Sequence, residues 1–160
     1  MDNPPLAYFI TWTVYGSFLQ GDECGWWKKF QGEQPRQPRL SQWHSDRLSH
    51  PILLLNDRDR SAVESAIDEH CLHRQWKRWA SSARTNHVHT VITAIEYDGK
   101  KVRDQLKANA TRKLRAQAER WIDRPAWTTK GWIEFIDSED DLERVVEYTL
   151  FAQDRKDRDL

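Results

Sequence analysis

The order of strand-like and helix-like segments is the feature that most constrains the fold of this 160-residue chain. β-branched and aromatic segments favour strands, whereas apolar residues spaced three and four apart favour helices. The order is strand, helix, strand, strand, helix, strand, helix. It predicts an α+β fold, a ferredoxin-like sandwich with a mostly antiparallel sheet and helices on one face. The predicted strands are Tyr8–Val14, Trp76–Ala83, His87–Ala94 and Trp132–Ile136, and the predicted helices are Asp57–Arg74, Val102–Trp121 and a last one that follows Ser138.

Capping and breaking residues mark the ends of these helices. Asn56 or Asp57 can cap the first helix, because a short polar side chain accepts hydrogen bonds from backbone N–H groups of the first turn. Pro125 is expected to end the second helix. Ser138 precedes three acidic residues, which the positive end of a helix dipole favours, so it is the expected cap of the last helix.

We expect one domain over residues 1–160, because this length suits a single hydrophobic core. Gly16, Gly21 and Gly25 interrupt the pattern after the first strand. The stretch at about 16–51 is therefore predicted to be an irregular insertion.

The cysteines and the apolar runs indicate a cytoplasmic protein that does not enter a membrane. Cys24 and Cys71 lie far apart and form no disulfide framework, which favours a reducing compartment. The longest apolar run, Ile52 to Leu55, is too short to cross a bilayer, and no signal peptide is recognisable. The motif His70-Cys71-Leu72-His73 is interpreted as structural, because it falls on a predicted helix without complementary ligands elsewhere.

His87-Val88-His89 lies in the most β-branched segment of the chain. Residues two apart on a strand project from the same face, so the two imidazoles are expected side by side. Such a pair is half of a site for a divalent metal, which can polarise a phosphoryl oxygen.

Tyr148 is the candidate nucleophile for phosphate chemistry. It is expected in the last helix, one step off the apolar stripe, with an exposed phenol. The unperturbed phenol has a pKa of about 10, so it is a poor nucleophile at neutral pH unless a neighbouring cation stabilises the phenolate or the metal activates the phosphate. Gln153, five residues on, offers a carbonyl oxygen as a further metal ligand.

A basic segment and an unusual number of tryptophans are open to two interpretations. Lys100 to Arg124 holds nine basic and three acidic residues, which is typical either of a surface that binds a polyanion or of a solvated helix face. The candidate DNA contacts are Lys101, Arg103, Lys107, Arg112 and Lys113. The nine tryptophans are expected mostly in the core, although a few could stack on unpaired bases.

Three segments taken in order resemble one known family. Asn86-His87-Val88-His89, the Val102–Leu114 helix and Val146-Glu147-Tyr148-Thr149-Leu150 resemble the single-tyrosine HUH transposases of small insertion sequences, and most of all the REP-associated tyrosine transposases. Tyr8 to Gly16 and Gly21-Asp22-Glu23 resemble the start of such proteins. The resemblance spans nearly the whole chain.

The resemblance implies a mechanism for DNA transposition and recombination. His87 and His89 would hold Mg²⁺ or Mn²⁺, and Tyr148 would attack a phosphodiester of single-stranded or hairpin DNA. The products would be a 5′-phosphotyrosine and a free 3′-OH, and the reverse reaction would rejoin strands. Relatives build the site within one chain or by exchanging the tyrosine helix in a homodimer.

The position of the glutamine departs from the family pattern. The family places its third metal ligand four residues after the tyrosine, where this chain has Ala152, whereas Gln153 is five residues after it. On a regular α-helix residues five apart are rotated by about 140°. Either the helix ends or distorts near Phe151, or another residue or water completes the site.

Two other functions fit the same residues. The chain could be a domesticated relative that binds hairpin or single-stranded DNA without cutting it. It could also be a zinc-dependent hydrolase that uses the two histidines without the tyrosine.

Overall fold

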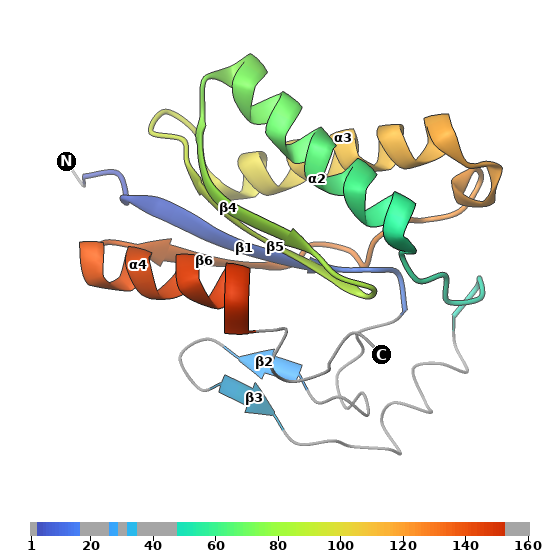
Figure 1. The fold of residues 1–160 in the computed structure, drawn as a ribbon, viewed down its shortest axis with the longest axis horizontal. Helices are drawn as coiled ribbons and strands as arrows, with labels where there is room; N and C mark the ends of the chain where they lie inside the picture. Colours follow the sequence, from blue (N-terminus) through green and yellow to red (C-terminus); the bar gives the residue numbers. More distant parts are fainter. Residues whose placement is uncertain (1–2, 17–25, 29–31, 35–47, 153–160) are drawn as a thin grey trace.

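The computed structural model describes residues 3–16, 26–28, 32–34 and 48–152 (Figure 1). Its centre is a four-stranded antiparallel sheet in the order β4-β5-β1-β6. This strand order, with one helix after β1 and one after β5, is that of a ferredoxin-like α+β fold, as the sequence predicts. The strands are β1 (Ala7–Thr13), β4 (Lys77–Ala83), β5 (His87–Thr93) and β6 (Trp132–Ile136), and the helices are α2 (Asp57–Arg74), α3 (Gly99–Gln117) and α4 (Glu139–Glu147).

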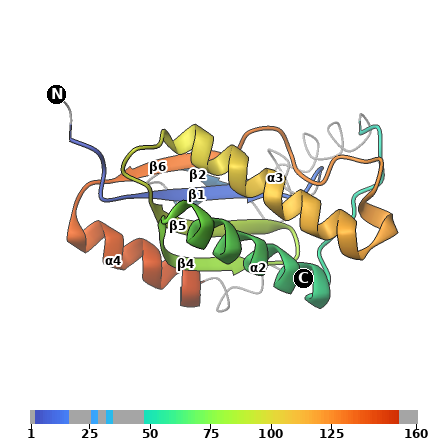
Figure 2. The ribbon, with the colours of Figure 1, turned by 90° about the horizontal axis from the view of Figure 1, so that it is seen from above.

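The helices lie on both faces of the sheet, whereas the sequence predicted them on one. α2 and α3 cover one face, and α4 lies across the other (Figures 1 and 2). The reason lies in β1, where all seven residues are buried. Both faces of β1 carry an aromatic side chain and neither carries a charged one, so β1 is the sign in the sequence that a second layer exists.

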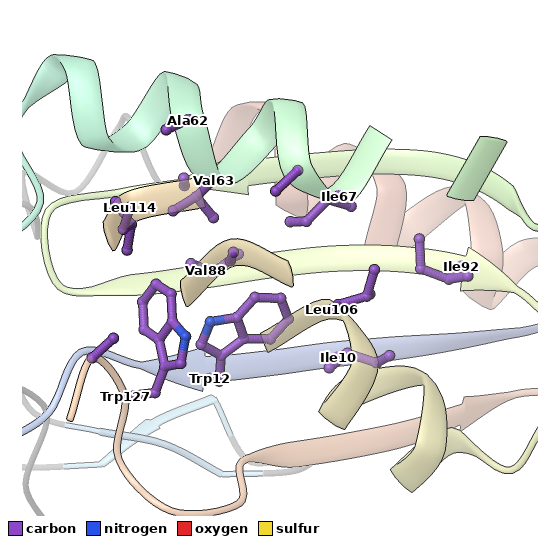
Figure 3. Packing of buried hydrophobic residues seen from close by; sticks show 14 of the residues in the cluster. Ile10, Trp12, Ala62, Val63, Ile67, Val88, Ile92, Leu106, Leu114 and Trp127 are labelled. Carbon is purple, nitrogen blue, oxygen red and sulfur yellow. The ribbon is translucent and has the colours of Figure 1, made fainter. Parts of the chain in front are cut away.

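The larger core lies between the sheet and the pair α2 and α3 (Figure 3). Trp12 of β1 is fully buried there and meets Trp127 edge to face, with ring centroids 5.9 Å apart. The smaller core lies under α4, where Phe9 and Val91 of the sheet pack with Val145 of the helix. The two cores use alternate residues of the same strands, as the period of a strand requires.

Two further elements differ from the predicted ones. α3 ends at Gln117, before the expected stop at Pro125, and the chain continues through the short 3-10 helix η1 (Glu119–Trp121). Ala118 ends α3 because its backbone is extended, with φ −150° and ψ 123°. Within the expected irregular insertion, β2 (Trp26–Lys28) and β3 (Gly32–Gln34) form an antiparallel pair, and the rest of that stretch up to residue 47 is outside the described residues.

Asp59 ties the start of α2 to η1. Its carboxylate is 1% exposed, and it accepts hydrogen bonds from the backbone N–H of Asn56 at 3.0 Å and from the indole N–H of Trp121 at 3.2 Å. It also forms an ion pair with Arg120. Asn56 completes a capping box by accepting from the Asp59 N–H.

Lys107 ties α3 to the segment that leads into β6. Its ammonium donates to the carbonyl oxygen of Thr128 at 2.9 Å and to that of Lys130 at 2.5 Å. Burial, and next the charge of Arg103, lower the pKa of Lys107 to about 8 from its usual 10.5. No helix in the described ranges is both long enough and apolar enough to span a membrane.

Asp59→Ala is expected to destabilise the fold by about 2–4 kcal/mol, because it removes a cap and leaves buried donors without an acceptor. Urea unfolding followed by tryptophan fluorescence measures the change. Asp57→Ala is the matched control, because Asp57 is in the same turn with a side chain 94% exposed, and its loss is expected to be far smaller. Equal losses in the two variants would contradict the role given to Asp59.

Lys107 is expected to make the fold more stable as pH rises from about 8 to about 10.5. In this window the unfolded chain holds a proton on Lys107 that the folded chain has begun to lose, so the unfolding free energy increases with pH. Unfolding curves of the parent and of Lys107→Met at several pH values test this. The parent should gain stability relative to the variant through the window, and a constant difference would show that the pKa is not lowered.

Candidate active site

His87 and His89 project from β5 toward the α4 side of the sheet. Val88 between them belongs to the larger core, so the histidines occupy the opposite face. Their ring centroids are 4.8 Å apart. The imidazoles therefore lie side by side, as the His-x-His spacing predicts.

Each imidazole is held through its Nδ1 atom. The Nδ1–H of His87 donates to the Oδ1 of Asn86 at 2.6 Å, and the Nδ1 of His89 is hydrogen-bonded to the Thr11 hydroxyl at 2.7 Å. The Asn86 oxygen thus puts the proton of His87 on Nδ1 and its lone pair on Nε2, and a Thr11 hydroxyl that accepts from His89 gives the second ring the same tautomer. Such hydrogen bonds fix the tautomer and orientation of histidines that ligate metals, so this pair is suited to bind a cation.

The surroundings of His89 keep it uncharged at neutral pH. Its side chain is buried, and burial, followed by the charges of His87 and Arg84, lowers its pKa well below the usual 6.5. Phe9 stacks on its ring with centroids 5.4 Å apart. A neutral imidazole is the form that donates to a metal ion.

Tyr148 lies against the same histidine. Its ring centroid is 5.6 Å from that of His89 and 6.2 Å from that of Phe9, and both contacts are edge to face. The phenol was expected to be exposed, but the residue is partly buried against the smaller core, and this burial raises its pKa. The phenolate is therefore costly to form without a nearby cation.

The chain after α4 changes its helical period. Tyr148–Ala152 form a π-helix, η2, which packs against β4 and β5. A π turn of this kind is a distortion of the helix near Phe151, one of the two arrangements considered from the sequence. Gln153, the expected third ligand, lies outside the described residues.

The basic residues of α3 are not near the histidines. α3 covers the opposite face of the sheet, so Lys101 and Arg112 are exposed on the far side of the molecule (Figure 1). Lys113 is also there and forms an ion pair with Glu69 at 2.6 Å. The structure does not bring these side chains to the candidate site.

Two of the predicted DNA contacts do not have the exposed position that this role requires. Arg103 is buried, and its Nε pairs with Asp104 at 2.9 Å. Lys107 is bound to two backbone carbonyl groups. Both residues turn toward the segment before β6 rather than away from α3, and a count of charges along a helix cannot detect that.

The described part of the chain contains no group of three or more His, Cys, Asp or Glu side chains placed to hold a metal. A third protein ligand beside the two histidines would thus be of another type or outside the described ranges. Cys71 is buried in the larger core, where burial raises the pKa of its thiol to about 12. This agrees with the structural interpretation of the motif around it.

Sequence reasoning missed two residues of the site. Thr11 is paired with His89 in the register of β1 and β5, and Phe9 is two residues before Thr11 on the same face. The resemblance of the Tyr8 to Gly16 segment assigns no role to either residue, so the strand register had to be known to find them. Asn86 adjoins the His-x-His motif, but the sequence does not reveal its hydrogen bond.

Comparison with known proteins gives a likeness of structure and none of sequence. No family model matches the chain, and no curated protein matches it. A solved structure of the REP-associated tyrosine transposase bound to a REP hairpin matches 99% of this chain and 73% of its own, with a TM-score of 0.55 and 12% identity. A transposase candidate from Deinococcus radiodurans R1 matches 90% of this chain and 88% of its own, with a TM-score of 0.47 and 12% identity. The chain thus has the fold of the REP-associated tyrosine transposase over nearly its whole length.

Proposed function

We propose that this protein cleaves and rejoins single-stranded DNA through a covalent link to Tyr148, with a divalent cation held by His87 and His89. The observation that supports the proposal most is the contact of the Tyr148 ring with His89, 5.6 Å between centroids. His89 comes from β5 and Tyr148 from η2, yet the two rings lie on one face of the sheet. The fold shared with the REP-associated tyrosine transposase is the second support.

His87 and His89 would be the protein's cation ligands, and Asn86 and Thr11 would orient them. The hydrogen bonds to the two Nδ1 atoms fit this role. Mg²⁺ or Mn²⁺ bound there would polarise a phosphoryl oxygen and offset developing negative charge. Imidazole ligands favour Mn²⁺ over Mg²⁺, so Mn²⁺ is expected to bind more tightly.

Tyr148 would act as the nucleophile. Its phenol oxygen forms a bond to phosphorus while the bond from phosphorus to the 3′ oxygen breaks. The phenol proton is lost to solvent, and the leaving 3′ oxygen takes up a proton. The products are a 5′-phosphotyrosine and a 3′-OH. Attack by a 3′-OH on the phosphotyrosine reverses the step, so two cycles on different strands produce the strand transfer of transposition.

Hairpin or single-stranded DNA is the proposed substrate. A solved structure of the REP-associated tyrosine transposase, whose fold this chain shares, is bound to a REP hairpin, which supports the same class of ligand here. A homodimer that exchanges the tyrosine helix is one way to build the site. Convergence of the tyrosine with the histidines within a single chain favours a site made by one copy.

A protein that binds such DNA without cutting it is the second candidate. The raised pKa of Tyr148 favours it, because a neutral phenol is a poor nucleophile. A cation beside the ring would lower that pKa again, so the two candidates differ in what metal does to the tyrosine.

Tyr148→Phe is expected to abolish a covalent adduct with DNA, because the adduct requires the phenol oxygen. The parent is incubated with 5′- and 3′-labelled hairpin oligonucleotides and Mn²⁺, and adducts are detected on denaturing gels. Tyr97→Phe is the matched control, a tyrosine on the α2 and α3 side of the sheet, and should keep activity.

The outcomes separate the candidates. Binding by the parent without any adduct supports the non-cutting protein. Cleavage that persists in Tyr148→Phe supports a hydrolase that uses only the histidines and rejects the covalent mechanism.

We further propose that the π turn brings Gln153 to the cation as third ligand. Hydrogen bonds in a π-helix join residues five apart. In such a helix the fifth residue comes about one turn along, the place of the fourth residue in an α-helix. The π turn would therefore compensate for the glutamine being five residues after Tyr148 rather than the four of the family pattern.

Gln153→Ala is expected to weaken Mn²⁺ binding roughly tenfold or more, as loss of site groups commonly does. Moving the glutamine back by one residue, with Ala152→Gln and Gln153→Ala together, should not restore it. Titration of Mn²⁺ followed by electron paramagnetic resonance measures the affinities. Full recovery in the double variant would show that the cation site follows an α-helical register.

A further inference from the structure

We infer that Trp79 and Lys77, on the edge strand β4, form a binding site for an unpaired nucleobase of the DNA strand. The inference rests on the proposed function and names a further contact of its substrate. Trp79 is one of the exposed large side chains, with 43% of its surface accessible. A single exposed tryptophan is common on proteins, so the argument depends on how this one is held.

Two interactions fix the indole ring of Trp79. Its Nε1–H donates to the Thr93 hydroxyl at 2.8 Å, and the Lys77 ammonium lies 5.2 Å from the centre of its ring. Thr93 donates in turn to the carbonyl oxygen of Leu6. A ring held in this way loses little conformational entropy when a ligand stacks on it.

A β-bulge directs Trp79 to the face of the candidate site. Register is shifted between Arg78 and Ala80, so Trp79 is the additional residue of β4. Arg78 pairs with Asp68 on the α2 side of the sheet. Thr93, which accepts the hydrogen bond of the Trp79 indole, instead shares its face with Val91 and the histidines. Bulges at sheet edges commonly redirect one side chain in this manner.

The strand that carries Trp79 also contacts the segment of the proposed nucleophile. η2, which begins with Tyr148, packs against β4 (Figure 2 shows α4 beside β4 at this edge). A strand of DNA with its phosphate at Tyr148 would therefore have neighbouring nucleotides along β4.

The chemistry of the pair suits a nucleotide. Every base offers a flat face to an indole ring, and a lysine beside the ring supplies a charge for the phosphate. Both contacts are indifferent to base identity. We therefore assign to Trp79 a base of any sequence in an unpaired stretch, and not a base pair of the hairpin stem.

Trp79→Ala is expected to weaken binding of a single-stranded oligonucleotide about tenfold, the loss typical of one stacked base. Trp79→Phe should keep most of the affinity. Binding is measured by fluorescence anisotropy with EDTA present and in the Tyr148→Phe background, so that neither metal nor cleavage contributes. Phe135→Ala is the matched control, an exposed aromatic residue on the other edge strand, β6, and should bind like the parent.

An abasic scan separates stacking from a structural effect. One abasic site in the oligonucleotide should weaken binding to the parent, and the same abasic site should have no effect on Trp79→Ala. Cross-linking of 5-iodouracil oligonucleotides to the parent should modify Trp79, which tests the contact even if a variant fails to fold.

Three results would overturn the inference. The first is a folded Trp79→Ala variant that binds the single-stranded oligonucleotide with the affinity of the parent. The second is an abasic scan in which no position of the oligonucleotide depends on Trp79. The third is a change of oligomeric state in Trp79→Ala, which would identify a protein interface. If the parent binds no single-stranded DNA at all, both the nucleobase site and the proposed function are wrong. If Trp79→Ala binds normally while the parent still forms the Tyr148 adduct, only the nucleobase site is wrong.

Discussion

The burial of β1 on both of its faces is the constraint on which the rest of the structure depends. β1 is hydrogen-bonded to β5 on one side and to β6 on the other, so it fixes the register of the whole sheet. One set of its side chains packs under α2 and α3, and the alternate set packs under α4. The candidate site uses the second set, because Phe9 and Thr11 support His89 from the neighbouring strand.

The histidine pair combines two properties that a surface pair would lack. Burial lowers the pKa of His89 and keeps it neutral, and hydrogen bonds to Nδ1 hold both rings in one orientation. Burial raises the pKa of Tyr148. Burial thus keeps His89 in the form that binds a metal, but keeps Tyr148 in its less reactive neutral form. A cation between these groups would reconcile the two, because it binds neutral imidazoles and stabilises a phenolate.

The arrangement of strands and helices could be predicted from the sequence because it follows from local periods. α2 and β6 have the predicted bounds, and Asn56 and Ser138 cap their helices as expected. The His-x-His pair could be placed on one face for the same reason. The second layer of helix was missed, although the absence of charged side chains from both faces of β1 is its sign.

Contacts between distant segments could not be predicted. The support of His89 by Thr11 depends on strand register, and the inward-facing positions of Arg103 and Lys107 depend on the path of the chain before β6. The partial burial of Tyr148 depends on how α4 and its π turn lie on the sheet. The charge pattern of α3 predicts DNA contacts on that helix, but charge does not indicate which face of a sheet a helix will cover.

The unequal size of the two cores has a consequence for motion. α4 is held mainly by Val145 and a few partly buried neighbours, whereas α2 and α3 share the large core with both tryptophans of Figure 3. Segments with few buried apolar contacts open at a lower free energy than the whole fold. A lower opening free energy is therefore expected for α4 than for the layer formed by α2 and α3. In the proposed reaction, a local opening of this kind would carry the DNA strand bound to Tyr148 away from the imidazoles and return it without global unfolding.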